Sequence, residues 1–181
     1  MPITVAILGA GPLGRWLALS AARAGFRVLL EDVMPANLHH AQEALRAVLG
    51  PEALLNVSFV STIEDAVREA DLAIDCVPDE LESKLEILWL LDRMAPPRTV
   101  LATPTTRLSI ADLAACTYRP EKCIAIAREA SSMTASADTH ILLRTTSRTS
   151  AETVALVRSF WERVGFAPSF EMDPAEQLSD H

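Results

Sequence analysis

The sequence predicts an α/β fold in which a doubly wound, mainly parallel sheet carries helices on both faces. Short apolar runs alternate along the 181 residues with longer stretches in which apolar positions recur at helical spacing. Strands that alternate with helices are joined by crossovers, and such connections make neighbouring strands parallel. Half of the residues are apolar, so the chain can bury the core that this fold needs.

The strands are expected at the apolar runs, which are residues 5–8, 28–30, 57–60, 72–77, 100–102, 123–127, 141–145 and 168–170. The helices are expected between them, at residues 12–24, 35–49, 63–70, 81–94, 109–115 and 151–164. Pro12 suits a first helical turn, and Ser109 suits an N-cap. Gly25, Gly50 and Gly165 each follow a predicted helix end, where a left-handed cap is expected.

Composition and charge exclude several classes of function. The 24 acidic and 16 basic side chains give a net charge of −8, which argues against nucleic-acid and anionic-membrane partners. The apolar N-terminus has no positive region before it and runs into glycines, so it predicts a strand rather than a signal peptide. Cys76, Cys116 and Cys123 form no metal-ligand spacing, and we interpret them as buried thiols of a cytoplasmic protein.

We expect one domain over residues 1–181, with no membrane span and no metal site. Only residues 130–138 and the tail after Met172 have the composition of a linker.

Residues 9–14 read GAGPLG and fit the pattern GxGxxG. The motif follows a predicted strand and opens a predicted helix, which is the context of a Rossmann-type dinucleotide site. Gly9 would allow the tight turn, Gly11 the close approach of a pyrophosphate, and Gly14 the packing of helix on strand. The N–H groups at the helix start would bind the phosphates. The alternative is a glycine-rich turn without a ligand.

An acidic pair, Glu31 and Asp32, ends the second predicted strand. Asp32 can accept hydrogen bonds from the adenosine ribose, whereas Glu31 should point to the other face of the strand. Two adjacent acids would repel a 2′-phosphate, so NAD is favoured over NADP. A flavin or plain ADP-ribose is a further alternative.

Four later motifs carry a resemblance to a known family. Residues 71–84 read DLAIDCVPDELESK, residues 100–110 VLATPTTRLSI, residues 119–122 RPEK and residues 149–153 TSAET. Together with the glycine motif, these segments resemble the NAD-binding domain of the 3-hydroxyacyl-CoA dehydrogenase family. The resemblance covers nearly the whole chain.

The resemblance implies where a cofactor and a substrate would bind. It places Asp79 and Lys84 near the nicotinamide ribose, although the same two residues could form a surface pair at a helix start. Thr106 stands where the family has a serine that contacts substrate, and Pro104 replaces an asparagine. The residues expected to bind NAD are Gly9, Gly11, Pro12, Leu13, Gly14, Asp32, Cys76, Val77, Pro78, Asp79 and Lys84.

The catalytic dyad of the family is missing from the sequence. Ala127 occupies the position of the catalytic histidine, and Thr139 or Leu142 occupies that of the glutamate that orients it. Alanine cannot accept the hydroxyl proton. Glu129 and His140, together with Thr106, are the candidates for a catalytic role; a solvated loop glutamate and a polar strand histidine are the alternatives.

The resemblance implies hydride transfer between NAD and a 3-hydroxyacyl-CoA-like substrate, in fatty-acid metabolism. The alternative is a non-catalytic NAD-binding or regulatory module, or the cofactor half of a two-chain enzyme. The chain ends at His181, near the point where the family continues into a helical domain. We expect the apolar surface left without that domain to form a homodimer.

Overall fold

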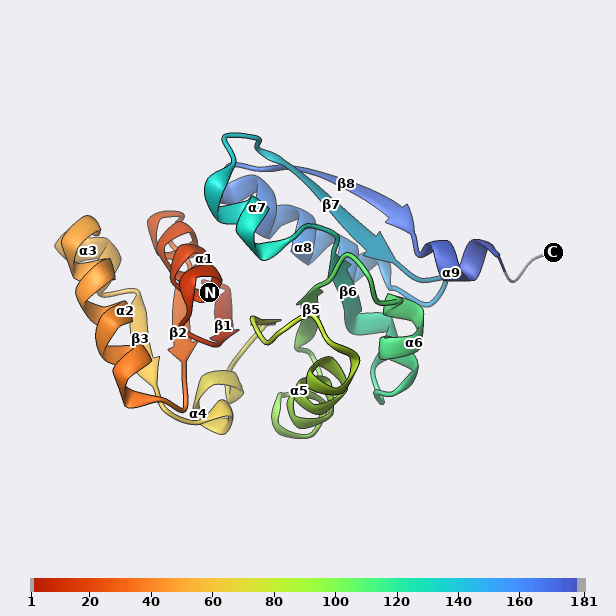
Figure 1. Ribbon diagram of the computed structural model, residues 1–181, viewed down its shortest axis with the longest axis horizontal. Coiled ribbons are helices and arrows are strands. Elements are labelled where there is room, and N and C mark those ends of the chain that lie inside the picture. Colours follow the sequence, from red (N-terminus) through yellow and green to blue (C-terminus); the bar gives the residue numbers. More distant parts are fainter. Residues whose placement is uncertain (1, 179–181) are drawn as a thin grey trace.

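The structure is a computed structural model that describes residues 2–178, and it confirms the expected fold class (Figure 1). One eight-stranded sheet runs through it in the order β3-β2-β1-β4-β5-β6-β7-β8. All neighbouring strands are parallel except the antiparallel pair β6 and β7. The strands are β1 Thr4–Leu8, β2 Arg27–Glu31, β3 Val57–Val60, β4 Leu72–Asp75, β5 Val100–Pro104, β6 Cys123–Ile126, β7 His140–Thr145 and β8 Ala167–Met172.

Helices cover both faces of the sheet. The first face is packed by α1, α2, α7 and α8, and the second by α4, α5 and α6. Strand β1 supplies side chains to both layers, because its successive residues point to opposite faces and all five are buried. The helical elements are α1 Pro12–Arg23, α2 Pro35–Val48, α3 Pro51–Leu54, α4 Ile63–Val67, α5 Leu81–Met94, α6 Ile110–Ala115, the 3₁₀ turn η1 Pro120–Lys122, α7 Ala130–Ala135, α8 Ala151–Arg163 and α9 Pro174–Gln177.

The strand order reverses beside β1, whose two neighbours are β2 and β4. The crossovers that leave β1 and β4 turn in opposite directions, so a crevice opens outside the carboxyl ends of these two strands. Ligands of open α/β sheets bind at such switch points. The fold therefore places the glycine motif and the residues after β4 at the edge where a ligand would bind.

Several expected boundaries are wrong. The predicted linker at 130–138 contains α7, which buries Met133 against the first face of the sheet. Part of the tail after Met172 forms α9, and residues 179–181 of that tail lie outside the described residues. Gly50 has φ −66° because it precedes α3, a helix that the sequence analysis missed. Gly25 and Gly165 have the expected positive φ, and Ser109 caps α6 by accepting a hydrogen bond from the Asp112 N–H at 3.2 Å.

The motif RPEK has a structural role that the sequence analysis did not assign. The buried guanidinium of Arg119 donates to the backbone oxygens of Asp92, Ala95, Pro96 and Thr99, and it pairs with the Asp92 carboxylate at 2.9 Å. Arg119 thereby satisfies carbonyl groups left free at the end of α5. The motif ties the segment before β6 to the end of that helix.

No helix within residues 2–178 is long and apolar enough to cross a lipid bilayer. Of the three cysteines, Cys123 is buried, Cys76 is partly buried and Cys116 is exposed. The expectation of three buried thiols is therefore wrong for Cys116, which lies just after the end of the short helix α6.

Candidate functional site

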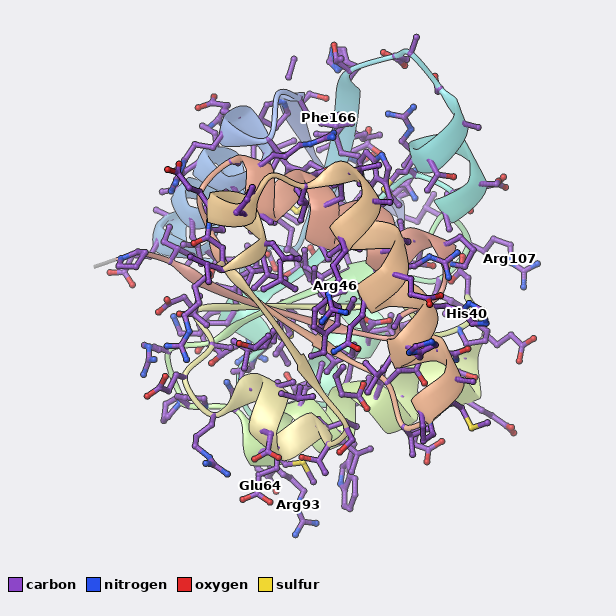
Figure 2. The ribbon with its side chains drawn as sticks, turned by 90° about the vertical axis from the view of Figure 1, so that its left-hand side faces the viewer. His40, Arg46, Glu64, Arg93, Arg107 and Phe166 are labelled. Atoms are coloured by element: carbon purple, nitrogen blue, oxygen red, sulfur yellow. The ribbon has the colours of Figure 1, made fainter. Side chains whose placement is uncertain are left out.

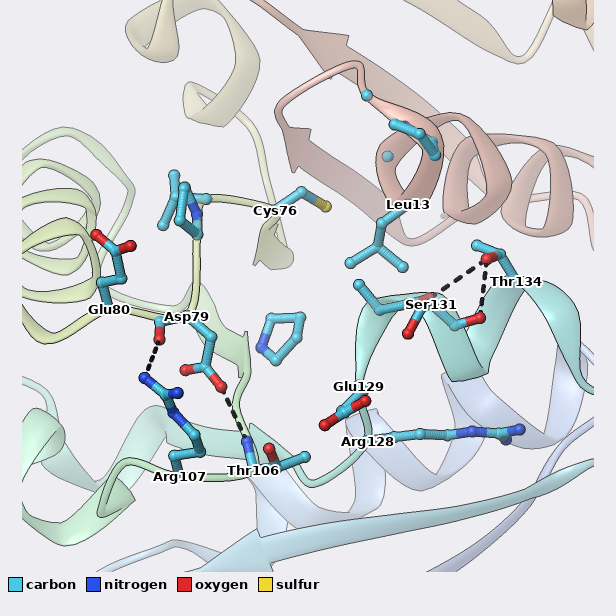
Figure 3. Close-up of a pocket in the computed structure, with 17 residues that line it drawn as sticks. Leu13, Cys76, Asp79, Glu80, Thr106, Arg107, Arg128, Glu129, Ser131 and Thr134 are labelled. Carbon is cyan, nitrogen blue, oxygen red and sulfur yellow. Dashed lines mark hydrogen bonds between the residues drawn. The ribbon is translucent and has the colours of Figure 1, made fainter.

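A cleft of about 740 Å³ opens at the carboxyl edge of the sheet (Figure 3). It joins the glycine motif to the segments that follow β4, β5 and β6. Its lining residues are Gly11, Pro12, Leu13, Gly14, Cys76, Val77, Pro78, Asp79, Glu80, Pro104, Thr106, Arg107, Arg128, Glu129, Ala130, Ser131 and Thr134. Residues that are distant in the sequence meet here because parallel strands end at the same edge.

The glycine motif has the shape of a phosphate cradle. Gly9 has φ +110°, a conformation that side chains disfavour. A Cβ on Gly14 would collide with the Gly9 carbonyl, so a glycine is required where α1 crosses β1. A Cβ on Gly11 would meet no atom within 4 Å, which leaves open space in front of the N-terminus of α1. The residues present therefore fit a pyrophosphate bound to free N–H groups.

Asp32 lies just after β2 and is 9% exposed. Its carboxylate accepts hydrogen bonds from the Ala10 N–H at 2.9 Å, the Met34 N–H at 2.8 Å and the Asn37 side-chain amide at 3.1 Å. Asp32 thus connects the end of β2 to the glycine motif and to the start of α2. Asn37 was missed in the sequence analysis, because only the fold brings it to this carboxylate.

Lys84 is buried and does not pair with Asp79, so the alternative of a surface pair at a helix start is wrong. The Lys84 side chain is 1% exposed, and its Nζ lies 2.8 Å from Oδ1 of the fully buried Asp75. The ammonium also donates to the Val77 carbonyl at 3.3 Å. Burial raises the pKa of Asp75, and the charge of Lys84 opposes this rise. The pair holds the segment after β4 against α5.

Asp79 and Thr106 are brought together, as Figure 3 shows. Oδ2 of Asp79 accepts a hydrogen bond from the Thr106 N–H at 3.2 Å, and the Asp79 carbonyl accepts one from Arg107 at 3.5 Å. The other carboxylate oxygen, Oδ1, is buried without a hydrogen-bond partner among the described residues. A buried acceptor without a donor fits a ligand that supplies a hydroxyl.

Cys76 forms part of the apolar wall of the cleft. Its Cβ lies 3.3 Å from the position that a Cβ on Gly9 would take. Burial raises the pKa of the Cys76 thiol far above its ordinary value, and the nearby Asp75 raises it further. The thiol stays protonated at neutral pH, so it is not a nucleophile.

The segment after β6 differs from the expectation. The strand ends at Ile126, and the Arg128 N–H turns back to the Ile126 carbonyl at 2.9 Å. Glu129 therefore does not continue the strand that we expected to run to Ala127. Glu129 precedes α7 and lines the cleft with an exposed side chain, whose carboxylate points into the cleft in Figure 3. His140 is exposed at the start of β7 and does not line this cleft.

Two other features of this side of the cleft come from α7 and from the segment before it. Ser131 and Thr134 line the cleft, and the Thr134 hydroxyl donates to the carbonyls of Ala130 and Ser131 within the helix. Both residues were missed because residues 130–138 read as a linker. The Arg128 guanidinium points away from the cleft in Figure 3 and bonds to Ser132 and to the carbonyls of Asp138 and His140. Arg128 thus secures the turn between α7 and β7.

Within the described part of the chain, no group of three or more histidine, cysteine or acidic side chains is placed to hold a metal ion.

Comparisons with known proteins identify the family of this chain. Residues 4–169 match the family described as 3-hydroxyacyl-CoA dehydrogenase, NAD binding domain. L-carnitine dehydrogenase of Burkholderia mallei is 37% identical over 131 residues, which cover 67% of this chain and 40% of that protein. The 5-formyl-3-hydroxy-2-methylpyridine 4-carboxylate 5-dehydrogenase of Mesorhizobium japonicum is 29% identical over 178 residues, which cover 91% of this chain and 55% of that protein.

The fold has close counterparts among solved structures. (S)-3-hydroxybutyryl-CoA dehydrogenase from Ralstonia eutropha has a TM-score of 0.85 over 96% of this chain and 64% of that chain, at 22% identity. That likeness shows the fold alone. The chain spans about half the length of the curated relatives it matches. Because the family match covers nearly all of its residues, the chain belongs to the 3-hydroxyacyl-CoA dehydrogenase family of NAD-dependent oxidoreductases and represents its NAD-binding domain.

Proposed function

We propose that this chain binds NAD along the carboxyl edge of the sheet and presents the nicotinamide to a 3-hydroxyacyl-CoA-like substrate. The observation that carries the proposal is the continuity of the cleft from the glycine motif to Asp79 and Thr106. The pyrophosphate would lie over residues 9–14, and the unpartnered Oδ1 of Asp79 would accept from the nicotinamide ribose. Cys76, Val77 and Pro78 would form the wall beside the cofactor. Lys84 would not contact the cofactor, but its pair with Asp75 would hold this wall in position.

Asp32 would contact the adenosine ribose at the other end of the cofactor. The residues around the pyrophosphate would be Gly9, Gly11, Pro12, Leu13 and Gly14. Three internal donors fix the Asp32 carboxylate at the end of β2, so it is oriented before the ligand arrives. A 2′-phosphate would lie against the negative charge of Asp32, so NAD would bind more tightly than NADP.

Glu129 is the residue that we propose as proton acceptor in any turnover. Ala127 has no titratable group, His140 lies outside the cleft, and the hydroxyl of Thr106 is suited to contact substrate rather than to take a proton. Glu129 combines a free carboxylate with a place on the cleft wall.

A second candidate function is a cofactor-holding module, either regulatory or one half of a two-chain enzyme. Ala127 at the histidine position favours this candidate, because no described residue supplies an imidazole to the cleft. For either function we propose a single domain over residues 1–181 in a cytoplasmic homodimer that acts in fatty-acid metabolism. Light scattering at high protein concentration would reveal a monomer if the dimer is wrong.

The test combines NADH binding with turnover. NADH is titrated by calorimetry, and acetoacetyl-CoA is then added while the NADH absorbance is followed. If NADH is oxidised, and if Glu129→Gln lowers the rate of that oxidation at least about tenfold, the result supports the enzyme function with Glu129 as its base. Glu162→Gln is the matched control, because Glu162 is exposed on α8, which packs outside the cleft. Binding without oxidation supports the cofactor-holding module, and absence of NADH binding overturns both candidates.

A further inference from the structure

Glu31 is a buried acid that neither the fold nor the proposed cleft uses. It ends β2, where its register partners are Leu8 of β1 and Val60 of β3. The residue is 7% exposed. No described residue donates a hydrogen bond to its carboxylate or forms an ion pair with it; only its backbone carbonyl is engaged, by the Gly9 N–H. The Glu31 residue is largely buried, but neither of its carboxylate oxygens is among the fully buried atoms without a partner, so a ligand at the end of β2 can reach the carboxylate and supply the missing donor.

Burial raises the pKa of Glu31 to about 7, and the neighbouring charge of Asp32 raises it further. The two acids face opposite sides of the strand, and their surroundings differ. Asp32 is oriented by three internal donors, whereas both carboxylate oxygens of Glu31 are free to accept. Glu31 lies on the face covered by α4, α5 and α6, since it is two residues beyond Leu29 on the same strand.

The sheet order decides which half of a dinucleotide would reach Glu31. The cleft with Asp79 and Thr106 lies on the β4 and β5 side of β1, and β2 lies on the other side. A dinucleotide whose pyrophosphate crosses the glycine motif, with its nicotinamide in the cleft, must extend its adenosine over the end of β2. There Val33 and Met34 expose apolar side chains, at 75% and 56%, against which a flat base can pack.

We propose that Glu31 is a specificity-determining residue for the adenine base, whose exocyclic amino group donates a hydrogen bond to its carboxylate. The inference rests on the proposed binding of NAD and adds a base preference to it. An amino group is the donor that a carboxylate requires, whereas a base with a carbonyl at that position would place two acceptors against each other. A hydrogen bond to a charged group in a buried site discriminates strongly between two such ligands.

The experiment compares NADH with reduced nicotinamide hypoxanthine dinucleotide, in which a carbonyl replaces the adenine amino group, by calorimetry at pH 8. The wild-type chain is expected to bind NADH at least about tenfold more tightly. Glu31→Met, which removes the acceptors and adds no buried charge, should bind the two dinucleotides within about twofold of each other. Glu31→Gln should keep part of the preference, because its amide carbonyl still accepts.

Glu64→Met is the matched control, since Glu64 is exposed on α4 and points away from the protein in Figure 2. It should retain the full preference. An unchanged preference in Glu31→Met overturns the inference, as does an equal loss of both ligands, which would indicate a ribose contact instead. Wild-type binding of NADH without any base preference overturns this inference alone, whereas absence of NADH binding overturns the proposed function as well.

Discussion

Replacing Lys84 by methionine tests the buried ion pair beneath the cleft. The Lys84 ammonium and the Asp75 carboxylate are 2.8 Å apart, with side chains 1% and 0% exposed. At an effective dielectric near 20 this separation corresponds to an attraction of ~6 kcal/mol. Without Lys84, Asp75 can take up a proton, which removes part of the cost of an unpaired buried carboxylate. We therefore expect Lys84→Met to lower the free energy of unfolding by about 3–5 kcal/mol at pH 7.

The assay is urea denaturation followed by tryptophan fluorescence at pH 7 and pH 5. Burial raises the pKa of Asp75, so without Lys84 the folded chain holds this proton more strongly than the unfolded chain. The loss in Lys84→Met should therefore shrink as the pH falls. Asp75→Asn combined with Lys84→Met should recover at least ~2 kcal/mol, because no charge is then left unpaired. Lys122→Met, at a lysine without an ion pair among those described, should change stability by less than ~0.5 kcal/mol. A loss below ~1 kcal/mol in Lys84→Met would refute the reasoning.

Three further predictions concern other parts of the fold. Gly14→Ala should prevent α1 from packing on β1, because its Cβ would collide with the Gly9 carbonyl, and a variant with wild-type thermal stability would contradict this. Arg119→Met should cost about 3–5 kcal/mol in urea unfolding, because it removes the cation that pairs with the Asp92 carboxylate and leaves several backbone carbonyls without their donor; a loss under ~1 kcal/mol would be inconsistent with the network. Between its ordinary pKa of 4.5 and the folded value of about 7, Glu31 binds protons more strongly in the folded chain, so stability falls as the pH rises through this window. Glu31→Gln should remove that fall and gain ~1–2 kcal/mol over wild type at pH 8 but nothing at pH 4, and an equal gain at both values would count against it.

The sheet and its main helices could be predicted, because buried parallel strands are short apolar runs and their helices have one apolar stripe. The helix α7 could not, since serine and threonine dominate its six residues and only Met133 is buried. Gly50 was misread because the sequence does not show whether a glycine ends one helix or precedes the next. In the structure it does the latter, with ordinary φ.

The backbone geometry of the glycine motif was also predictable, because it depends on the local conformation of a few residues. The partner of Lys84 was not. Asp79 is nearer in the sequence, but the strand end at Asp75 is what faces α5 in the folded chain. Nor could the buried state of Glu31 be predicted, because alternation along β2 gives the face to which its side chain points but not the helices that cover that face.

The most direct test of the account is calorimetric titration of NADH into the wild-type chain and into Gly11→Val. A Cβ at Gly11 meets no atom within 4 Å, so the variant should fold with unchanged circular dichroism while its side chain fills the space in front of α1. The account predicts NADH binding by the wild type and its loss in Gly11→Val. Equal NADH affinity in the two proteins would contradict the placement of the pyrophosphate over the glycine motif.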